Sequence, residues 1–224
     1  MTVLPNFAVH KVWRGHNREY NLETAAQKET YLEFFNLDFE SKKYKQGSVF
    51  HATTLMSNHS HEVSKVTNPS LFSNHMRRHH SRYGSYFNKL SNRCGKVAQD
   101  RPHTTLLENS HHEMETVFYV HANPIRAKIV KDARNYFWST HRLYAFGKRE
   151  AWMRNIELPE WYLNLGKNST QRQHVYRKLF NRYLAEKGAT RQSFLKRRFF
   201  GSLLWCASRE AAISDWRREH DSPS

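Results

Sequence analysis

Cysteine is scarce in this chain, and the two residues present lie far apart. Among 224 residues there are only Cys94 and Cys206. A small domain held together by disulfides carries more cysteines, so this pattern does not indicate a disulfide framework. The sequence also has no internal repeat and no low-complexity tract. We therefore expect a folded protein of a reducing compartment, the cytoplasm.

Long hydrophobic runs are missing as well. No apolar segment approaches the roughly 18 residues that a membrane-spanning helix needs. The first residues, Met1–Asn6, have neither the basic start nor the long apolar core of a secretory signal. These two absences predict a protein that has no membrane partner.

Acidic residues are greatly outnumbered by basic ones. The chain has 20 Asp and Glu against 36 Lys and Arg, which gives a formal net charge of +16. Solubility alone seldom needs such a surplus, which is typical of proteins that bind a polyanion. Because no membrane segment accompanies the charge, nucleic acid is the expected partner. The contents of hydrophobic residues, 38%, and of aromatic residues, 14%, indicate a folded chain.

The pattern of apolar residues predicts an α+β fold. Strands are expected at 8–14, 48–56, 59–66 and 104–108, and helices at 25–37, 69–90 and 111–122. Asn123-Pro124 should end or kink the last of these helices, because a residue before proline avoids the α region. The order of elements indicates an antiparallel sheet with flanking helices in residues 1–146. Residues 147–224 should form a basic helical extension, with helices at 171–187, 190–199 and 208–218.

A pair of histidines lies at the start of the expected strand 59–66. Side chains two residues apart on a strand project from the same face, so the imidazoles of His59 and His61 should lie side by side. Two such imidazoles can share a divalent ion if a third ligand comes from elsewhere. The chain has 15 histidines, however, so the pair also arises easily by chance. Two partly exposed strand histidines are the simpler interpretation of the pair alone.

A tyrosine and an amide recur at helical spacing further along the chain. Tyr119 and Asn123 are four residues apart and should share one helical face. Alone, this spacing is typical of amphipathic packing. Together, the segments Met-Ser-Asn-His-Ser-His (56–61) and Tyr-Val-His-Ala-Asn-Pro-Ile-Arg-Ala (119–127) resemble the single-tyrosine HUH transposases, and specifically the REP-associated tyrosine transposases. That family has an M-P-N-H-hydrophobe-H hairpin and a Y-x-x-x-N-P-x-R-A segment, and the resemblance covers about residues 7–146.

The resemblance implies a ferredoxin-like sheet that carries a nuclease site. By position, His59 and His61 would be ligands of Mg²⁺ or Mn²⁺, Tyr119 the nucleophile and Asn123 a candidate third ligand. The enzyme would nick and rejoin single-stranded or hairpin DNA in the bacterial cytoplasm, associated with the nucleoid, as a monomer or homodimer. Such chemistry needs the metal because a free tyrosine, with a pKa of about 10, is a poor nucleophile at neutral pH.

This chain departs from the family pattern at two positions. Ser60 stands where the family has a bulky apolar residue, and Glu62 and Ser64 follow on the same side of the strand. The face away from the histidines is therefore expected to be solvated. Asn123 is shorter than the glutamine of related transposases, so we expect it to reach a metal through water.

Basic residues that could hold DNA phosphates are spread over the whole sequence. The candidates are Arg14, Arg77, Arg78, Arg82, Arg126, Lys128, Arg197 and Arg198. For the residues in helices, a solvated basic face explains the pattern equally well. In the C-terminal part, basic residues alternate with aromatic ones, which suits nucleic-acid binding by charge and stacking.

Three functions are compatible with these features. The first is an active transposase-like endonuclease and strand transferase. The second is a regulator of repetitive hairpin elements that binds DNA but cuts it weakly or not at all. The third is a histidine-rich metal-handling protein, which the basic surface disfavours. Formation of a covalent adduct with labelled hairpin DNA in the presence of Mn²⁺ separates the three.

Overall fold

A five-stranded sheet forms the centre of the molecule. The computed structural model describes residues 3–41, 44, 46–187 and 197–220. The strands are β1 (Ala8–Arg14), β2 (Ser48–Leu55), β3 (His59–Val66), β4 (His103–Leu107) and β5 (Phe199–Phe200), in the order β2-β3-β1-β4-β5. The first four pair antiparallel, whereas β5 pairs parallel with β4. The predicted α+β class and ferredoxin-like order are confirmed, and the parallel edge strand makes the sheet mixed.

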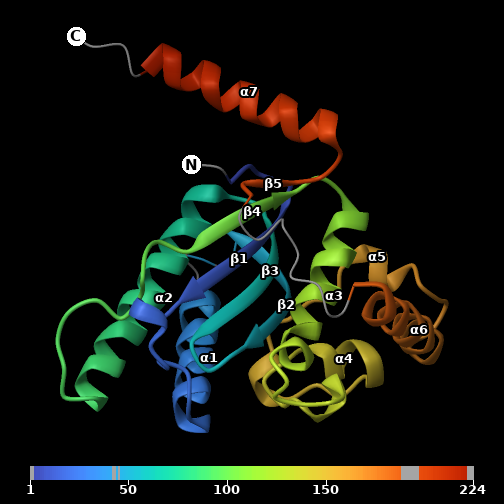
Figure 1. Cartoon of the computed structure of the whole chain (residues 1–224), viewed down its shortest axis with the longest axis horizontal. Coiled ribbons are helices and arrows are strands. Elements are labelled where there is room, and N and C mark those ends of the chain that lie inside the picture. Colours follow the sequence, from blue (N-terminus) through green and yellow to red (C-terminus); the bar gives the residue numbers. More distant parts are fainter. Residues whose placement is uncertain (1–2, 42–43, 45, 188–196, 221–224) are drawn as a thin grey trace.

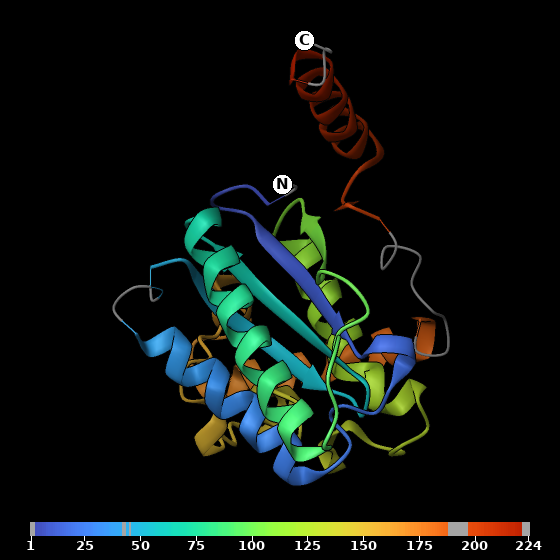
Figure 2. The same cartoon turned by 90° about the vertical axis from the view of Figure 1, so that its left-hand side faces the viewer.

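Helices cover both faces of the sheet. On one face lie α1 (Ala25–Glu40) and α2 (Pro69–Leu90), which pack against each other (Figure 2). The other face carries α3 (Ser110–Arg126), around which α4 (His141–Phe146), α5 (Glu160–Leu163) and α6 (Ser169–Lys187) gather (Figure 1). The last helix, α7 (Leu203–His220), projects from the body beyond β5. No helix in the described residues has the length and apolar character needed to cross a membrane.

Local sequence signals explain where the first helices begin. Thr24 forms a capping box with Gln27, in which each side chain bonds the other residue's backbone amide. The Asn68 side chain accepts a hydrogen bond from the Leu71 amide, and Pro69 follows at the first helical position. These signals are readable without a structure, and the predicted starts of both helices are confirmed.

Two predictions about helices were wrong. α3 continues through Pro124 to Arg126, so the expectation that it might end at Asn123 was wrong. A helix was predicted at 190–199, but Phe199 belongs to strand β5. Residues 190–196 lie outside the described part of the chain. Backbone pairing explains the strand, because Leu106 and Glu108 of the β4 edge donate hydrogen bonds to the carbonyls of Arg198 and Phe200.

The face of β3 that points away from the histidines is buried, which corrects the expectation of a solvated surface. Ser60, Glu62 and Ser64 are at most 3% exposed beneath α1 and α2. The polarity of Ser60 and Glu62 is met within the protein, because the Lys11 ammonium lies 2.5 Å from the Glu62 carboxylate. The Tyr31 hydroxyl adds hydrogen bonds to Ser60 (2.9 Å) and Glu62 (3.1 Å). These two polar residues are therefore tolerated here because they share one network, whereas the buried Ser64 hydroxyl has no hydrogen-bond partner among the described residues.

Residues on both sides of position 146 share one hydrophobic core. Buried side chains of the later segment, Met153, Tyr162, Tyr176, Phe180 and Tyr183, pack in the same cluster as residues from β1, β2, β3 and α3. His121 of α3 connects them further, since its two ring nitrogens contact the Tyr176 hydroxyl (2.6 Å) and the Thr140 hydroxyl (2.7 Å). The division of the chain at residue 146 stays a prediction, and it does not coincide with a break in this core.

The buried ion pair gives a prediction about stability. Burial lowers the pKa of Lys11 and the charge of Glu62 opposes that effect, so the Lys11 ammonium depends on Glu62. Glu62→Gln leaves the ammonium without a counter-charge and should reduce the free energy of unfolding by about 3–5 kcal/mol. Urea denaturation measures the loss. The double variant Lys11→Met/Glu62→Gln should recover most of it, and equal instability of the two variants would show that the ion pair is not the cause.

Candidate active site

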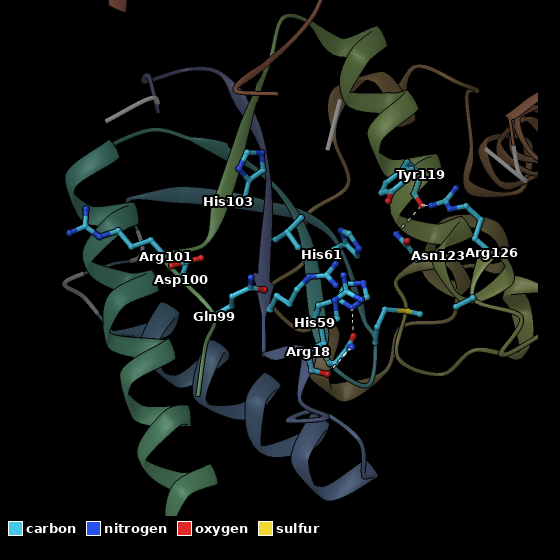
Figure 3. A pocket seen from close by; sticks show the side chains of 15 residues that line it. Arg18, His59, His61, Gln99, Asp100, Arg101, His103, Tyr119, Asn123 and Arg126 are labelled. Carbon is cyan, nitrogen blue, oxygen red and sulfur yellow. Dashed lines mark hydrogen bonds between the residues drawn. The ribbon is translucent and has the colours of Figure 1, made fainter. Parts of the chain in front are cut away.

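A cavity of about 890 Å³ opens between the sheet and α3. Figure 3 shows His59 and His61 on one side of it and Tyr119, Asn123 and Arg126 of α3 on the other. A third wall is made of Gln99, Asp100 and Arg101, in the segment before β4, and of His103, the first residue of β4. The structure thus brings together the four residues predicted from the histidine and tyrosine segments.

The two histidines share a face of β3, as predicted. Their ring centroids lie 4.8 Å apart, with the rings nearly perpendicular. His61 is only 2% exposed, while His59 is half-buried at the cavity. On neighbouring β1, His10, Val12 and Arg14 alternate onto the same side of the sheet, because Val12 pairs with His61 and Arg14 with His59.

Each imidazole has one ring nitrogen engaged in a hydrogen bond inside the protein. Nδ1 of His59 lies 2.6 Å from the side-chain oxygen of Asn58, whose amide nitrogen donates to the Arg18 carbonyl. Nδ1 of His61 lies 3.0 Å from Nε2 of His10, and the two rings are stacked within 7° of parallel. Both histidines are therefore held at Nδ1, and a metal ion would bind to each through Nε2.

Burial keeps this inner histidine pair neutral. It lowers the pKa of His10 to about 3, and it lowers the pKa of His61 well below the ordinary value, with His59 and His10 as further causes. Arg126 and Arg14 act in the same direction on His61. A neutral imidazole is the form that binds metal ions.

Tyr119 faces the histidines from α3. Its ring lies edge-on to His61, at a centroid distance of 5.7 Å, and edge-on to His10, at 6.0 Å. The Arg126 guanidinium lies over the Tyr119 ring, 3.9 Å from its centroid, and donates to the Tyr119 backbone carbonyl. Arg126 thereby fixes the tyrosine through both its ring and its backbone.

The Asn123 amide explains why α3 tolerates Pro124. Proline has no backbone N–H, so the Val120 carbonyl loses its helical donor. Nδ2 of Asn123 donates to the carbonyls of Val120 (3.3 Å) and Tyr119 (3.1 Å), which replaces that bond. A metal would then meet only Oδ1 of Asn123, and this ligand role stays a prediction.

The predicted phosphate-binding residues fall into four environments. Arg14 and Arg126 line the first cavity. Arg77 and Arg198 line a second cavity of about 1090 Å³, between α2 and β1, which shares Asp100, Arg101 and His103 with the first. Arg78 and Arg82 instead reach the Asp38 carboxylate of α1, at 2.8 and 3.3 Å. Lys128 and Arg197 are exposed, and the Arg197 carbonyl accepts hydrogen bonds from β4.

Sequence reasoning missed several residues of the cavity. His10 gave no signal because its partner is 51 positions away and the contact depends on strand register. Arg18, Gln99 and Arg101 lie in irregular segments, which no periodic pattern places. The stacking of Arg126 on Tyr119 was readable in principle, since a seven-residue separation on a helix returns to the same face.

The donor set fits a divalent ion that has ligands besides the protein. In the part of the chain that the structure describes, no group of three or more His, Cys, Asp or Glu side chains is arranged to hold a metal. Two imidazole nitrogens are present, and phosphate oxygens or water would supply the remaining ligands, as metals that act on phosphates commonly require.

Comparison with known proteins supports the fold. No model of a protein family matches the sequence, and no curated protein matches it. A solved structure of a REP-associated tyrosine transposase bound to a REP hairpin is similar, with a TM-score of 0.52 and 17% sequence identity. The match covers 66% of this chain and 84% of that one. At this identity the likeness establishes a shared fold.

The pairing of Asn123 with Pro124 is testable by a double-mutant cycle. Asn123→Ala leaves a buried carbonyl without its donor and should lower the free energy of unfolding by about 1–3 kcal/mol. Adding Pro124→Ala restores the backbone N–H and should recover most of that loss in urea denaturation. Strictly additive effects would contradict the compensation. If Asn123 also binds metal, the double variant regains stability while its Mn²⁺ affinity stays low.

Proposed function

We propose that this protein is a metal-dependent endonuclease and strand transferase, related to tyrosine transposases, that acts on single-stranded or hairpin DNA. The observation that carries the proposal is the placement of Tyr119 against His61 at a cavity lined by arginines. The fold shared with a hairpin-bound transposase supports the same proposal. The protein is expected to act in the bacterial cytoplasm, at the nucleoid, as a monomer or homodimer.

The residues of the cavity divide the chemistry among them. His59 and His61 would hold Mg²⁺ or Mn²⁺ through Nε2, and the ion would neutralise charge on the scissile phosphate and orient it. Arg14 and Arg101 would bind phosphates of the strand. The Tyr119 oxygen forms a bond to phosphorus, and the bond to the 3′ oxygen breaks. The hydroxyl proton of tyrosine passes to water, the released 3′ oxygen takes up a proton from water, and a 5′-phosphotyrosine remains.

Retention of the phosphodiester in this covalent link makes rejoining feasible without an energy source. A released 3′ hydroxyl can attack the phosphotyrosine and reverse the first step. Tyr119 is 4% exposed, so its hydroxyl meets only a strand that enters the cavity. This burial favours single-stranded DNA, because a duplex would not bring its backbone to so enclosed a group.

A DNA-binding regulator without cutting activity is the second candidate. The specific observation in its favour is the use of the Asn123 amide nitrogen in helix bonds, which leaves one oxygen for a metal. Under this alternative, hairpin DNA binds equally well with or without Mn²⁺ and no covalent adduct forms.

Substitution of the nucleophile tests the proposed reaction. Tyr119→Phe removes one oxygen and retains the ring beneath Arg126, so the fold and DNA affinity should persist. Cleavage of labelled hairpin DNA in Mn²⁺ and the covalent adduct should both disappear. Mass spectrometry of the proteolysed parent adduct should place the nucleotide on Tyr119.

A matched control comes from the opposite face of the sheet. The Tyr83 hydroxyl, also buried, donates to the Asn21 carbonyl, and neither residue lines the cavity. Tyr83→Phe should therefore retain the adduct. A nucleotide on another tyrosine, or an adduct that persists in Tyr119→Phe, contradicts the assignment.

Two adjacent arginines of α2 test the path of the DNA. Arg77 lines the second cavity, whereas Arg78 is paired with Asp38. If the strand crosses from the catalytic cavity over Asp100 and Arg101, Arg77→Gln should weaken oligonucleotide binding and reduce the slope of log affinity against log salt by about 1. Arg78→Gln should leave both unchanged. Equal effects of the two substitutions would show that α2 contributes only diffuse charge.

A further inference from the structure

One hydrogen bond joins Nε2 of His10 and Nδ1 of His61. Which of the two nitrogens carries its proton decides whether Nε2 of His61 can bind a metal ion. If Nδ1 of His61 carries the proton, His10 accepts it and Nε2 of His61 presents a lone pair. If Nε2 of His10 carries the proton, Nε2 of His61 is itself protonated when the ring is neutral. Only the first arrangement lets His61 bind a metal ion.

We propose that His10 is a positioning residue that holds His61 in the tautomer with its Nε2 lone pair available to a divalent cation. The inference rests on the metal role in the proposed function. It concerns a residue outside the histidine and tyrosine segments, contributed by the neighbouring strand.

The geometry of the pair supports a directed hydrogen bond. The nitrogens are 3.0 Å apart and the rings lie within 7° of parallel. His10 is 0% exposed and His61 2%, so solvent does not compete for this bond. A ligand histidine in metal sites is ordinarily fixed through its second ring nitrogen, which sets tautomer and orientation.

The cavity itself favours the proton on Nδ1. Arg14 and Arg126 line the same space as His61. A lone pair directed toward guanidinium groups is electrostatically better than an N–H directed toward them. His59 gives a parallel case, because the Asn58 oxygen at its Nδ1 can only accept a hydrogen bond, so Nδ1 must carry the proton that forms it. The two imidazoles would then present Nε2 lone pairs to one ion.

The test compares substitutions at His10 that differ in hydrogen-bonding ability. His10→Phe retains a flat ring against His61 but has no acceptor, and it should lower Mn²⁺ affinity about 10–100-fold, as measured by the electron paramagnetic resonance signal of free Mn²⁺. His10→Gln supplies an acceptor oxygen near the former Nε2 and should restore part of that affinity. A purely structural role would not make Gln better than Phe.

A buried histidine on the other face provides the matched control. His79 is 0% exposed and its Nε2 lies 3.0 Å from the Tyr31 carbonyl. His79→Phe should change Mn²⁺ affinity less than twofold even if it lowers stability. Unchanged Mn²⁺ affinity in His10→Phe, or no advantage of His10→Gln over His10→Phe, overturns the proposal.

A second measurement needs neither metal nor DNA and works on the parent protein. Ring ¹⁵N chemical shifts distinguish a protonated from a bare nitrogen, and we expect His61 to show a protonated Nδ1 and a bare Nε2 in the metal-free state. A protonated Nε2 on neutral His61 would overturn the inference whatever the variants do. If the protein binds no Mn²⁺ at all, the proposed function fails, while the nitrogen shifts still decide the role of His10.

Discussion

The antiparallel register between β1 and β3 decides which side chains meet on each face of the sheet. Val12 opposite His61 and Arg14 opposite His59 place one set of side chains toward α3. The intervening Lys11 and Glu62, also opposite each other, point toward α1 and α2. A shift of one residue would exchange the faces of every side chain on the strand. The cavity chemistry and the buried ion pair therefore depend on the same backbone pairing.

The polar interior beneath α1 and α2 helps to specify that register. An apolar face could slide by two residues and still be buried, whereas the Lys11–Glu62 pair and the Tyr31 hydroxyl satisfy one another only in the observed alignment. Replacing such a pair by apolar residues often costs no stability, so its value here would be specificity. On the other face, the same alignment brings His10 within 3.0 Å of His61.

Most of the fold was predictable because its elements carry local signals. The pattern of apolar residues and turns located β1 to β4, and Thr24 and Asn68 located the starts of α1 and α2. The burial of Ser60, Glu62 and Ser64 was not predictable, since it depends on a lysine from another strand. Pro124 was misread because its cost is met by the preceding Asn123 side chain. Within the site, the residues of the segments 56–61 and 119–127 could be predicted from their spacing in the sequence. His10 and Arg101 join them only through the tertiary structure.

The C-terminal part of the chain contacts the site through the hydrophobic core that it shares with Tyr119. Tyr183 of α6 is buried, which raises its pKa to about 12, while the nearby Arg126 guanidinium acts in the opposite direction. Arg198 directly precedes β5, which pairs with β4, and it lines the second cavity. This C-terminal segment supports α3 and also supplies Arg198 to the second cavity. Its removal would therefore alter both. DNA contacts in this region are therefore better separated by single substitutions such as Arg198→Gln than by truncation.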